Sequence, residues 1–333
     1  MRSIITGKRI VVTGGTGSFG NIFIRSILPF HPKEIVVLSR DENKQGAMKL
    51  EFQGAPIRFI LGDVRDYDSV KNALRGADIV IHAAALKWIP EVESNVWEGV
   101  KTNVIGTQHI IQAAFENNVQ KVVALSTDKA VEPVNAYGMG KALGERLMTT
   151  ANSTRGAKGP VFVSTRYGNV LGSRGSVVPL FRKLIDEGKP LTITDPSMTR
   201  FLLTLGESTE LILTALKEGV GGEVFVRKIP AHTLKDLAEV LLESLPAMRR
   251  KIVEIGSRPG EKIHETLVSV GESQRTVEMG AYFVVLPQIK LPAVEKKYKG
   301  FAPMIASRFG SDTTRRLTND NLRAILHKEK WIL

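Results

Sequence analysis

The feature that most constrains the fold of this chain is a glycine-rich turn that directly follows a short apolar strand. The strand is predicted over residues 9–13, and the turn reads Gly14-Gly15-Thr16-Gly17-Ser18-Phe19-Gly20. A helical pattern with apolar residues at positions 22, 23 and 27 follows it. Glycines at this spacing let a pyrophosphate approach the amides of a helix N-terminus. The segment therefore predicts the first unit of a Rossmann sheet, with Gly14, Thr16, Gly17, Ser18, Phe19 and Gly20 against a dinucleotide.

The end of the second predicted strand, residues 34–39, bears on which dinucleotide is bound. Arg40 follows Ser39 and lies twenty residues after Gly20. A carboxylate at this place holds a ribose 2′-hydroxyl in NAD enzymes, whereas an arginine accommodates a 2′-phosphate. Ser39, Arg40 and Lys44 therefore favour NADP over NAD. Asp41 would take the NAD role if the strand ended later, and this alternative stays open.

Two further strands predict the rest of the cofactor wall. Residues 58–61 lead to Asp63 and Val64, and residues 78–81 lead to Ala83, Ala84, Ala85 and Lys87. Asp63 is expected to meet an adenine amino group or, alternatively, to cap the next helix. The three alanines would let the strand end pack against the cofactor. His82 is expected to be a packed, satisfied histidine rather than a catalyst.

Hydroxyl, carboxylate, amine and phenol groups gather within residues 126–141. A buried strand is predicted over residues 121–125, so Ser126 to Lys129 should lie at its carboxyl end, where open α/β sheets bind ligands. Tyr137 and Lys141 are four residues apart in a helical stretch and should share one helix face. A neighbouring ammonium favours the phenolate form of a tyrosine. The segment predicts an acid–base site beside the cofactor.

The regular alternation of strands and helices ends after about residue 165. A polar, glycine-rich loop is expected at 168–176, a short strand at 191–194, a helix at 234–242 and another helix through Leu267. Arg174, Arg200 and Arg258 are isolated loop arginines, which suits either a bidentate grip on phosphate or surface ion pairs. We therefore predict an α/β fold: a Rossmann doubly wound parallel sheet with a smaller C-terminal α/β substrate-binding lobe.

The predicted domain boundaries follow from the end of the regular alternation of strands and helices near residue 165. Residues 1–168 form the NADP-binding Rossmann domain, with a return segment near 202–227. Residues 169–201 and 228–333 form the substrate-binding lobe and a basic tail.

Residues 290–333 hold ten Lys and Arg against four Asp and Glu, which is half of the net charge of +12. Because aromatic residues are not interleaved with them, a solvated basic face is favoured over nucleic-acid recognition, and a basic cleft would suit an anionic substrate.

Composition excludes several other classes of site and location. The absence of cysteine excludes disulfides, thiol catalysis and cysteine-based metal sites. The six histidines form no ligand-spaced pair, so no metal is expected. The chain enters its first strand without an apolar signal segment, and no apolar run approaches membrane-spanning length. A cytoplasmic protein without a membrane partner is expected.

Together these motifs resemble the extended short-chain dehydrogenase/reductases and, more narrowly, the soluble C5-inverting UDP-N-acetylglucosamine 4,6-dehydratases of the pseudaminic-acid type. The resemblance runs from about residue 8 to about residue 325. It departs from the family at Gly140, Val96 and Arg227, which affects loop shape more than chemistry. The residues that carry it are Gly14/Gly17/Gly20, Ser39-Arg40-Asp41-Glu42, Asp63, Asn103, Ser126-Thr127-Asp128-Lys129, Tyr137-x3-Lys141, Arg166-Tyr167-Gly168-Asn169, Met198-Thr199-Arg200-Phe201 and Arg258-Pro259-Gly260-Glu261-Lys262.

The resemblance implies a tightly held NADP and the following roles. Tyr137, helped by Lys141, takes the proton of the sugar 4-hydroxyl, while Thr127 or Ser126 holds the 4-oxygen. Lys129 removes the C5 proton and Asp128 assists loss of the C6 hydroxyl. To act as a base Lys129 must be partly neutral, and burial beside Lys141 and an oxidised nicotinamide is expected to lower its pKa. Asn103 joins the cofactor site, and the UDP-N-acetylhexosamine ligands are Lys87, Asn169, Arg174, Thr192, Arg200, Arg258 and Glu261.

The pair Asp128-Lys129 separates the alternatives within this fold. Retaining sugar-nucleotide dehydratases usually carry Asp-Glu here, so the lysine favours inversion at C5. A retaining 4,6-dehydratase, a UDP-sugar 4-epimerase and a non-catalytic NADP-binding sensor remain the competing hypotheses. The resemblance also implies a homo-oligomer, a dimer or a higher assembly up to a hexamer.

Overall fold

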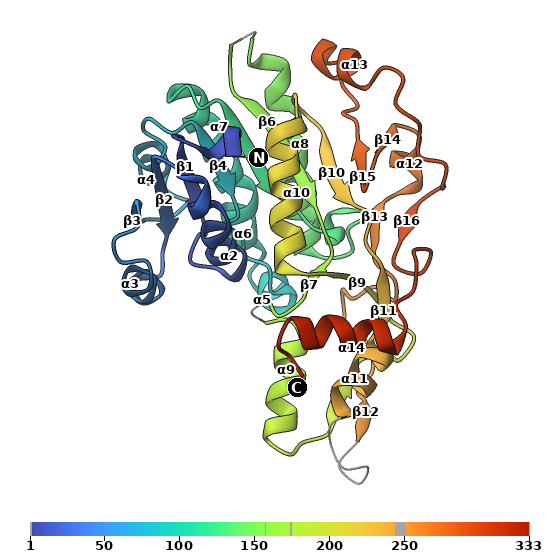
Figure 1. Cartoon of the computed structure of the whole chain (residues 1–333). Helices are drawn as coiled ribbons and strands as arrows, with labels where there is room; N and C mark the ends of the chain where they lie inside the picture. The colour runs from blue at the N-terminus through green and yellow to red at the C-terminus, as the bar shows by residue number, and fades with distance from the viewer. Residues whose placement is uncertain (1, 157, 174, 244–250, 333) are drawn as a thin grey trace.

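The centre of the molecule is a nine-stranded sheet in the order β14-β15-β10-β6-β5-β4-β1-β2-β3 (Figure 1). The computed structural model describes residues 2–156, 158–173, 175–243 and 251–332. Seven neighbouring strands are parallel, which confirms the expected doubly wound sheet. They are β3 (Ile57–Leu61), β2 (Glu34–Ser39), β1 (Arg9–Thr13), β4 (Ile79–His82), β5 (Lys121–Leu125), β6 (Val161–Arg166) and β10 (Val224–Arg227).

Two antiparallel strands extend this sheet at one edge. β15 (Tyr282–Val285) pairs with β10, and β14 (Thr276–Met279) pairs with β15. Both come from the range 228–333, which the sequence assigned to the smaller lobe. The division into domains stays a prediction.

The parallel strands are apolar on both faces because helices cover both faces. Successive side chains of a strand point to opposite sides, so Ile10 and Val12 of β1 pack into one core and Val11 into the other, all three fully buried. Helices α2 (Ser18–Ile27) and α10 (Leu205–Glu218) cover the first face, and α4 (Tyr67–Ala73), α7 (Gly106–Glu116) and α8 (Ala136–Thr154) cover the second.

A smaller lobe projects below the sheet (Figure 1). Its two strands pair in parallel, and Phe181, Leu237 and Leu322 are among the residues of its apolar core. The C-terminal helix packs in this core, so the end of the chain belongs structurally to the lobe. The elements of the lobe are α9 (Val177–Asp186), β8 (Leu191–Ile193), α11 (Leu234–Leu242), β12 (Ile252–Glu254) and α14 (Asn319–Lys328).

Short strands connect the lobe to the main sheet. β7 (Asn169–Val170), β9 (Thr199–Leu203) and β11 (Ala231–Thr233) form one small sheet. The helix expected through Leu267 is wrong: β13 (Thr266–Val268) pairs antiparallel with β16 (Phe309–Gly310). Thr266 and Val268 are β-branched, and Leu267 and Val268 are fully buried, so a pleated strand fits these residues better than a helix.

The remaining elements are short or lie at the edges of the sheet. They are α1 (Arg2–Ile5), η1 (Leu28–Phe30), α3 (Glu42–Glu51), α5 (Ile89–Ser94), α6 (Val96–Val100), the π-helical turn η2 (Lys101–Ile105), η3 (Asp128–Ala130), α12 (Val270–Ser273) and α13 (Pro292–Tyr298).

Candidate active site

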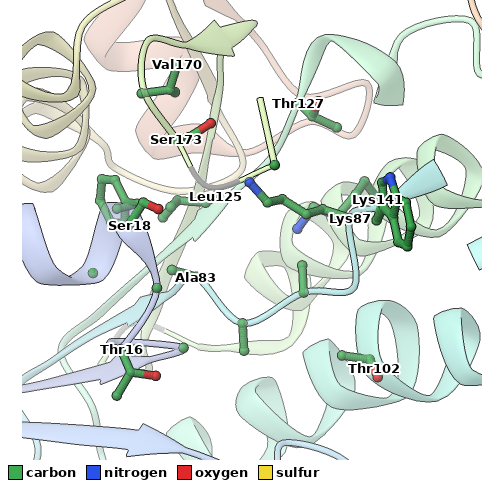
Figure 2. A pocket seen from close by; sticks show the side chains of 18 of the residues that line it. Thr16, Ser18, Ala83, Lys87, Thr102, Leu125, Thr127, Lys141, Val170 and Ser173 are labelled. Carbon is green, nitrogen blue, oxygen red and sulfur yellow. The ribbon is translucent and has the colours of Figure 1, made fainter. Parts of the chain in front are cut away.

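A cleft of about 880 Å³ opens at the carboxyl ends of β1, β2, β4, β5 and β6. Figure 2 shows Thr16 and Ser18 of the glycine-rich turn, Lys87, Lys141 and Ser173 around it. The predicted cofactor and acid–base residues come together here, although they are spread over the first half of the chain. Those lining the cleft are Gly14, Thr16, Gly17, Ser18, Phe19, Gly20, Ser39, Arg40, Lys44, Asp63, Val64, Ala83, Ala84, Ala85, Lys87, Thr127, Asp128, Lys129, Tyr137 and Lys141.

The glycine-rich turn brings two loops too close together for side chains. Gly14 has a φ of 64°, and a β-carbon there would lie 2.8 Å from the Cα atom of Ala84. A β-carbon on Gly20 would lie 2.4 Å from the Cα atom of Gly15. Helix α2 begins directly after Gly17, so its first amides border the cleft. The turn has the bare backbone that a dinucleotide pyrophosphate requires.

The end of β2 presents a cation, and the neighbouring carboxylate is engaged elsewhere. β2 ends at Ser39, so Arg40 is the first residue beyond it and is half-exposed at the cleft. Asp41 caps α3 by accepting a hydrogen bond of 3.0 Å from the Lys44 amide, and it pairs with the Lys44 ammonium. The strand therefore does not extend to Asp41.

Asp63 lies at the cleft between two arginines. It accepts hydrogen bonds from the amide (2.9 Å) and Nε (2.8 Å) of Arg65, and Arg40 Nη1 is 3.4 Å away. Burial alone would raise the pKa of Asp63, but these hydrogen bonds and charges hold it below its ordinary value. Asp66, and not Asp63, caps α4, so the capping alternative is wrong.

The loop after β4 is fixed by buried polar groups. His82 contacts the hydroxyls of Thr13 (2.8 Å) and Thr107 (3.2 Å), and burial together with the charge of Lys141 lowers its pKa to about 3. The expected packed, satisfied histidine is confirmed. Asn103 bonds both the amide and the carbonyl of Leu86 at 2.9 Å. Asn103 does not line the cleft, and its contact with a cofactor stays a prediction.

The acid–base segment is built from the turn after β5 and the start of α8. Thr127 caps η3 and donates a hydrogen bond of 2.8 Å to Asp128 Oδ1. Asn135 caps α8 by accepting from the Gly138 amide at 2.8 Å. A β-carbon on Gly138 would lie 2.1 Å from the carbonyl oxygen of Lys129. The absence of a side chain at Gly138 therefore lets the helix that carries Tyr137 pack directly on η3.

Burial shifts the pKa values of Tyr137 and Lys141 in opposite directions. Burial raises the pKa of Tyr137, and the Lys129 ammonium and the Thr127 hydroxyl oppose this by stabilising the phenolate. The sequence assigned that effect to Lys141, whereas the principal cation acting on Tyr137 is Lys129. Burial lowers the pKa of Lys141 to about 8, and the charge of Glu145 offsets part of this effect.

The expected lowering of the Lys129 pKa is wrong for this structure. The Lys129 ammonium is 3.1 Å from Asp128 Oδ1 and 3.2 Å from Glu265 Oε1. Burial lowers its pKa, but the two carboxylates outweigh burial and raise the pKa above its ordinary value. The expected lowering rested on burial, on Lys141 and on an oxidised nicotinamide. Glu265 lies too far along the chain to be recognised from sequence as a partner of Lys129.

The predicted substrate residues divide into three groups. Asn169 lines the cleft, whereas Thr192, Arg258 and Glu261 lie on β8 and on the loop after β12, outside its lining. Arg200 is buried, donates to the carbonyls of Thr199 (2.8 Å) and Ile263 (3.1 Å) and does not line the cleft. Arg174 lies outside the described residues. The binding roles of these six residues stay predictions.

Sequence reasoning missed several residues of the site. Glu265 is 2% exposed, and the helix expected around it gave no reason to place it beside Lys129. Trp88 is 61% exposed at the cleft edge and directly follows Lys87, which was the signal available for it. Further lining residues that were not assigned a role are Leu38, Gly62, Thr102, Leu125, Tyr167, Gly168, Val170, Ser173, Gly175, Ser176 and Leu205.

Within the described residues, no helix is long and apolar enough to cross a membrane. The cytoplasmic location stays a prediction.

Comparison with known proteins now decides the family. A family model described as "Polysaccharide biosynthesis protein" matches residues 10–287. The chain belongs to this family. A UDP-N-acetylglucosamine 4,6-dehydratase (inverting) of Campylobacter jejuni is 45% identical over 297 residues, 89% of this chain and 87% of the relative. The resemblance inferred from the motifs is thereby confirmed.

Other similar proteins carry different names. A UDP-glucose 4-epimerase of Rickettsia canadensis is 42% identical over 329 residues, 96% of this chain and 95% of the relative. The X-ray structure of Pen from Bacillus thuringiensis superimposes with a TM-score of 0.92 at 38% identity, covering 98% and 99% of the two chains. The dTDP-glucose 4,6-dehydratase DesIV from Streptomyces venezuelae, at 24% identity and a TM-score of 0.70 over 87% and 96%, shares the fold.

Proposed function

We propose that this protein is an NADP-dependent, C5-inverting UDP-N-acetylglucosamine 4,6-dehydratase that supplies a UDP-4-keto-6-deoxy-hexose for surface-sugar synthesis of the pseudaminic-acid type. The observation that carries the proposal is the pair Asp128-Lys129 in the same cleft as Tyr137, Lys141 and the glycine-rich turn. The Campylobacter jejuni relative, 45% identical, bears the name of that activity.

The cofactor site fits a nicotinamide dinucleotide, and Arg40 favours the phosphorylated form. Gly14 and Gly20 leave room for the pyrophosphate, and Ser39, Arg40 and Lys44 border the cleft where a ribose 2′-phosphate would lie. Asp41, the carboxylate that NAD would need, is committed to the α3 cap and to Lys44. When bound, the nicotinamide accepts a hydride and returns it.

Tyr137 is the base for the sugar 4-hydroxyl in this proposal. Its phenolate is stabilised by Lys129 and Thr127, and Lys141 lies one helical turn further along α8. Ser126 is the second candidate for holding the 4-oxygen, because its hydroxyl is buried at the cleft and has no hydrogen-bond partner within the described residues. Oxidation at C4 acidifies the proton on C5.

Lys129 and Asp128 act on C5 and C6. Lys129 takes the C5 proton once it is neutral, and Asp128 assists departure of the C6 hydroxyl as water. Asp128 is 1% exposed, and its Oδ2 has no hydrogen-bond partner among the described residues, so this oxygen is available for the leaving group. The UDP part would lie toward Asn169, Thr192, Arg258 and Glu261.

We also propose that the protein is a homo-oligomer that pairs through α6 and α8. Val96 and Trp97 of α6 are 49% and 64% exposed, and Met139 and Leu143 of α8 are 51% and 54% exposed. Large apolar side chains grouped on neighbouring helices are typical of a subunit contact. Light scattering of the protein and of Leu143→Glu tests this, and a monomeric parent protein would contradict it.

Proton NMR of the protein with UDP-N-acetylglucosamine in heavy water tests the function. We expect a 4-keto-6-deoxy sugar with deuterium at an inverted C5. A 4-epimer with an intact C6 hydroxyl would contradict the dehydratase and support the name of the Rickettsia canadensis relative. Deuterium at C5 with unchanged configuration would support a retaining dehydratase, and binding of NADP without any turnover would support a sensor.

A further inference from the structure

Lys129 presents a problem that the proposed function does not solve. A general base must be neutral, yet Lys129 is held as an ammonium between Asp128 Oδ1 and Glu265 Oε1, at 3.1 and 3.2 Å. Its proton has to leave before it can accept the C5 proton. The Lys129 side chain is 22% exposed at the cleft and the two carboxylates that hold it are almost fully buried, so a sugar in the cleft would separate this proton from bulk water.

Two carboxylates contact Lys129, and Glu265 is the one that has no role toward the substrate in the proposed function. It belongs to the strand region at the start of β13 and lies behind Lys129, since Asp128 and Lys129 line the cleft and Glu265 does not. Its backbone is fixed on both sides by Ser311, whose Oγ accepts from the Glu265 amide at 2.9 Å and whose amide donates to the Glu265 carbonyl at 2.8 Å. The carboxylate therefore has a defined place.

The charges around Glu265 are few. Besides Lys129, the nearest cation is Arg200, whose Nε is 3.9 Å from Oε1 and whose Nη1 is already bonded to two backbone carbonyls. Lys262 acts on it from the neighbouring loop, but its Nζ donates at 2.6 Å to the carbonyl of Val131. Glu265 Oε2 is buried without a hydrogen-bond partner in the described ranges of the chain. This oxygen is therefore an open hydrogen-bond acceptor directly behind Lys129.

We propose that Glu265 is the proton partner of Lys129. In the resting site Glu265 is a carboxylate and Lys129 an ammonium; one proton passes from Lys129 Nζ to Glu265, which leaves a neutral amine and a neutral carboxylic acid. The net charge of the site is unchanged, and a buried neutral pair avoids the desolvation of two ions. The amine is then free to take the C5 proton.

The protons taken up and released in this half-reaction balance. After Lys129 takes the C5 proton, Lys129 and Glu265 together hold one proton more than in the resting site. That proton leaves with the C6 hydroxyl as water, through Asp128, whose Oδ1 contacts Lys129. Glu265 touches neither sugar nor cofactor in this scheme, so it is a positioning residue that acts through Lys129. The scheme rests on the proposed dehydration.

The pH dependence of turnover separates this role from a structural one. In the parent protein the proton moves inside the pair, so the rate of dehydration should be flat across neutral pH. In Glu265→Gln the amine must lose its proton to solvent, so the rate should rise about tenfold per pH unit below the pKa of Lys129. Glu265→Asp, which keeps a carboxylate, should restore the flat profile at a reduced rate.

Glu223→Gln is the matched control. Glu223 is also buried, but it binds the amides of Val220 and Gly221 at 2.8 and 2.6 Å and lies outside the lining of the cleft. This variant loses a buried charge without touching Lys129, so its profile should stay flat. A flat profile for Glu265→Gln, or a steep one for Glu265→Asp, would overturn the proposal.

A measurement without turnover separates this inference from the proposed function. Nitrogen-15 NMR of lysine-labelled protein can follow the Lys129 amine, assigned by its loss in Lys129→Arg. We expect its pKa to fall by at least about one unit in Glu265→Gln, because one of two carboxylates is removed. An unchanged titration overturns the pairing. A lowered pKa in a protein that does not dehydrate UDP-N-acetylglucosamine supports the pairing and contradicts only the proposed function.

Discussion

The pKa values of the two lysines that line the cleft are shifted in opposite directions, although the two residues lie only twelve positions apart. On the cofactor side, Lys141 of α8 has a pKa lowered to about 8 by burial. On the elimination side, Lys129 of η3 has a raised pKa because Asp128 and Glu265 outweigh burial. The difference lies in the partners, since burial acts to lower the pKa of both side chains.

The reason that Lys141 lacks such partners lies one turn further along α8. Glu145 is the carboxylate that acts on Lys141, but it also binds the buried Arg166 through Nε at 3.0 Å and Nη2 at 2.5 Å. Arg166 also pairs with Glu272 at 2.9 Å. The charge of Glu145 is therefore largely compensated. Burial acts on every lysine of a cleft, and the nearest uncompensated carboxylate decides the direction of the shift.

Lys129→Arg should give the largest effect, and it should impair dehydration without impairing NADP binding or C4 oxidation. An arginine keeps the positive charge between Asp128 and Glu265 but does not give up a proton at accessible pH. We expect dehydration to fall roughly 1,000-fold, while NADP stays bound and C4 oxidation still produces reduced nicotinamide absorbance in a single turnover. Dehydration near the parent rate would remove Lys129 as the base.

Lys129→Met provides the contrast to that variant. It leaves two buried carboxylates without their ammonium, so we expect the unfolding free energy to fall by about 3–5 kcal/mol. Denaturant unfolding of both variants separates the charge of Lys129 from its basicity. Equal stability of the two variants would contradict the ion-paired state.

Gly14→Ala tests the cofactor side through its backbone. The new β-carbon would meet Ala84 at 2.8 Å in a residue with a φ of 64°. We expect the affinity for NADP to fall roughly 100-fold, about 3 kcal/mol, by calorimetry. Gly54→Ala is the control, since Gly54 has a φ of 81° and no atom within 4 Å of the added carbon; it should share the strain and keep the affinity.

The two sides of the cleft also differ in how well sequence could predict them. The cofactor side consists of residues that directly follow β1, β2, β3 and β4, so strand prediction and local motifs placed Gly14, Arg40, Asp63 and Ala84 correctly at one cleft. The elimination side includes Glu265, which is 3.2 Å from Lys129 and lies directly before β13, a strand that pairs with β16. That contact spans 136 residues of chain, and no local pattern encodes it.

Arg40→Ala tests the selection of NADP on the cofactor side, and its effect on affinity should be smaller. Arg40 has Asp63 at 3.4 Å as its neighbour and is half-exposed, so its removal should leave the fold intact. Loss of a charged hydrogen bond to a 2′-phosphate corresponds to about 1.5–3 kcal/mol, and we expect NADP affinity to fall by roughly 10–100-fold while NAD affinity is unchanged. Equal losses for both nucleotides would contradict NADP selection by Arg40.

The smallest effect concerns the pH dependence of stability, where Lys141 and Lys129 should act in opposite directions. Between pH of about 8 and the ordinary lysine value of 10.5, the unfolded chain still binds a proton that folded Lys141 has lost. Raising the pH through this window therefore stabilises the fold, by up to roughly 3 kcal/mol. Lys129 keeps its proton across this window, and its contribution is lost only at higher pH.

The cofactor-free Lys141→Met variant should not gain stability as the pH rises from about 8 to 10.5. Below pH of about 8 the folded parent protein bears the full cost of burying the Lys141 ammonium, so the variant should be the more stable of the two there. The difference should shrink as pH rises through the window, because the parent protein loses that charge and the variant has none to lose. Urea unfolding of both proteins at several pH values measures it. A constant difference across the window would mean that Lys141 is already neutral or stably paired, and the contrast with Lys129 would then fail.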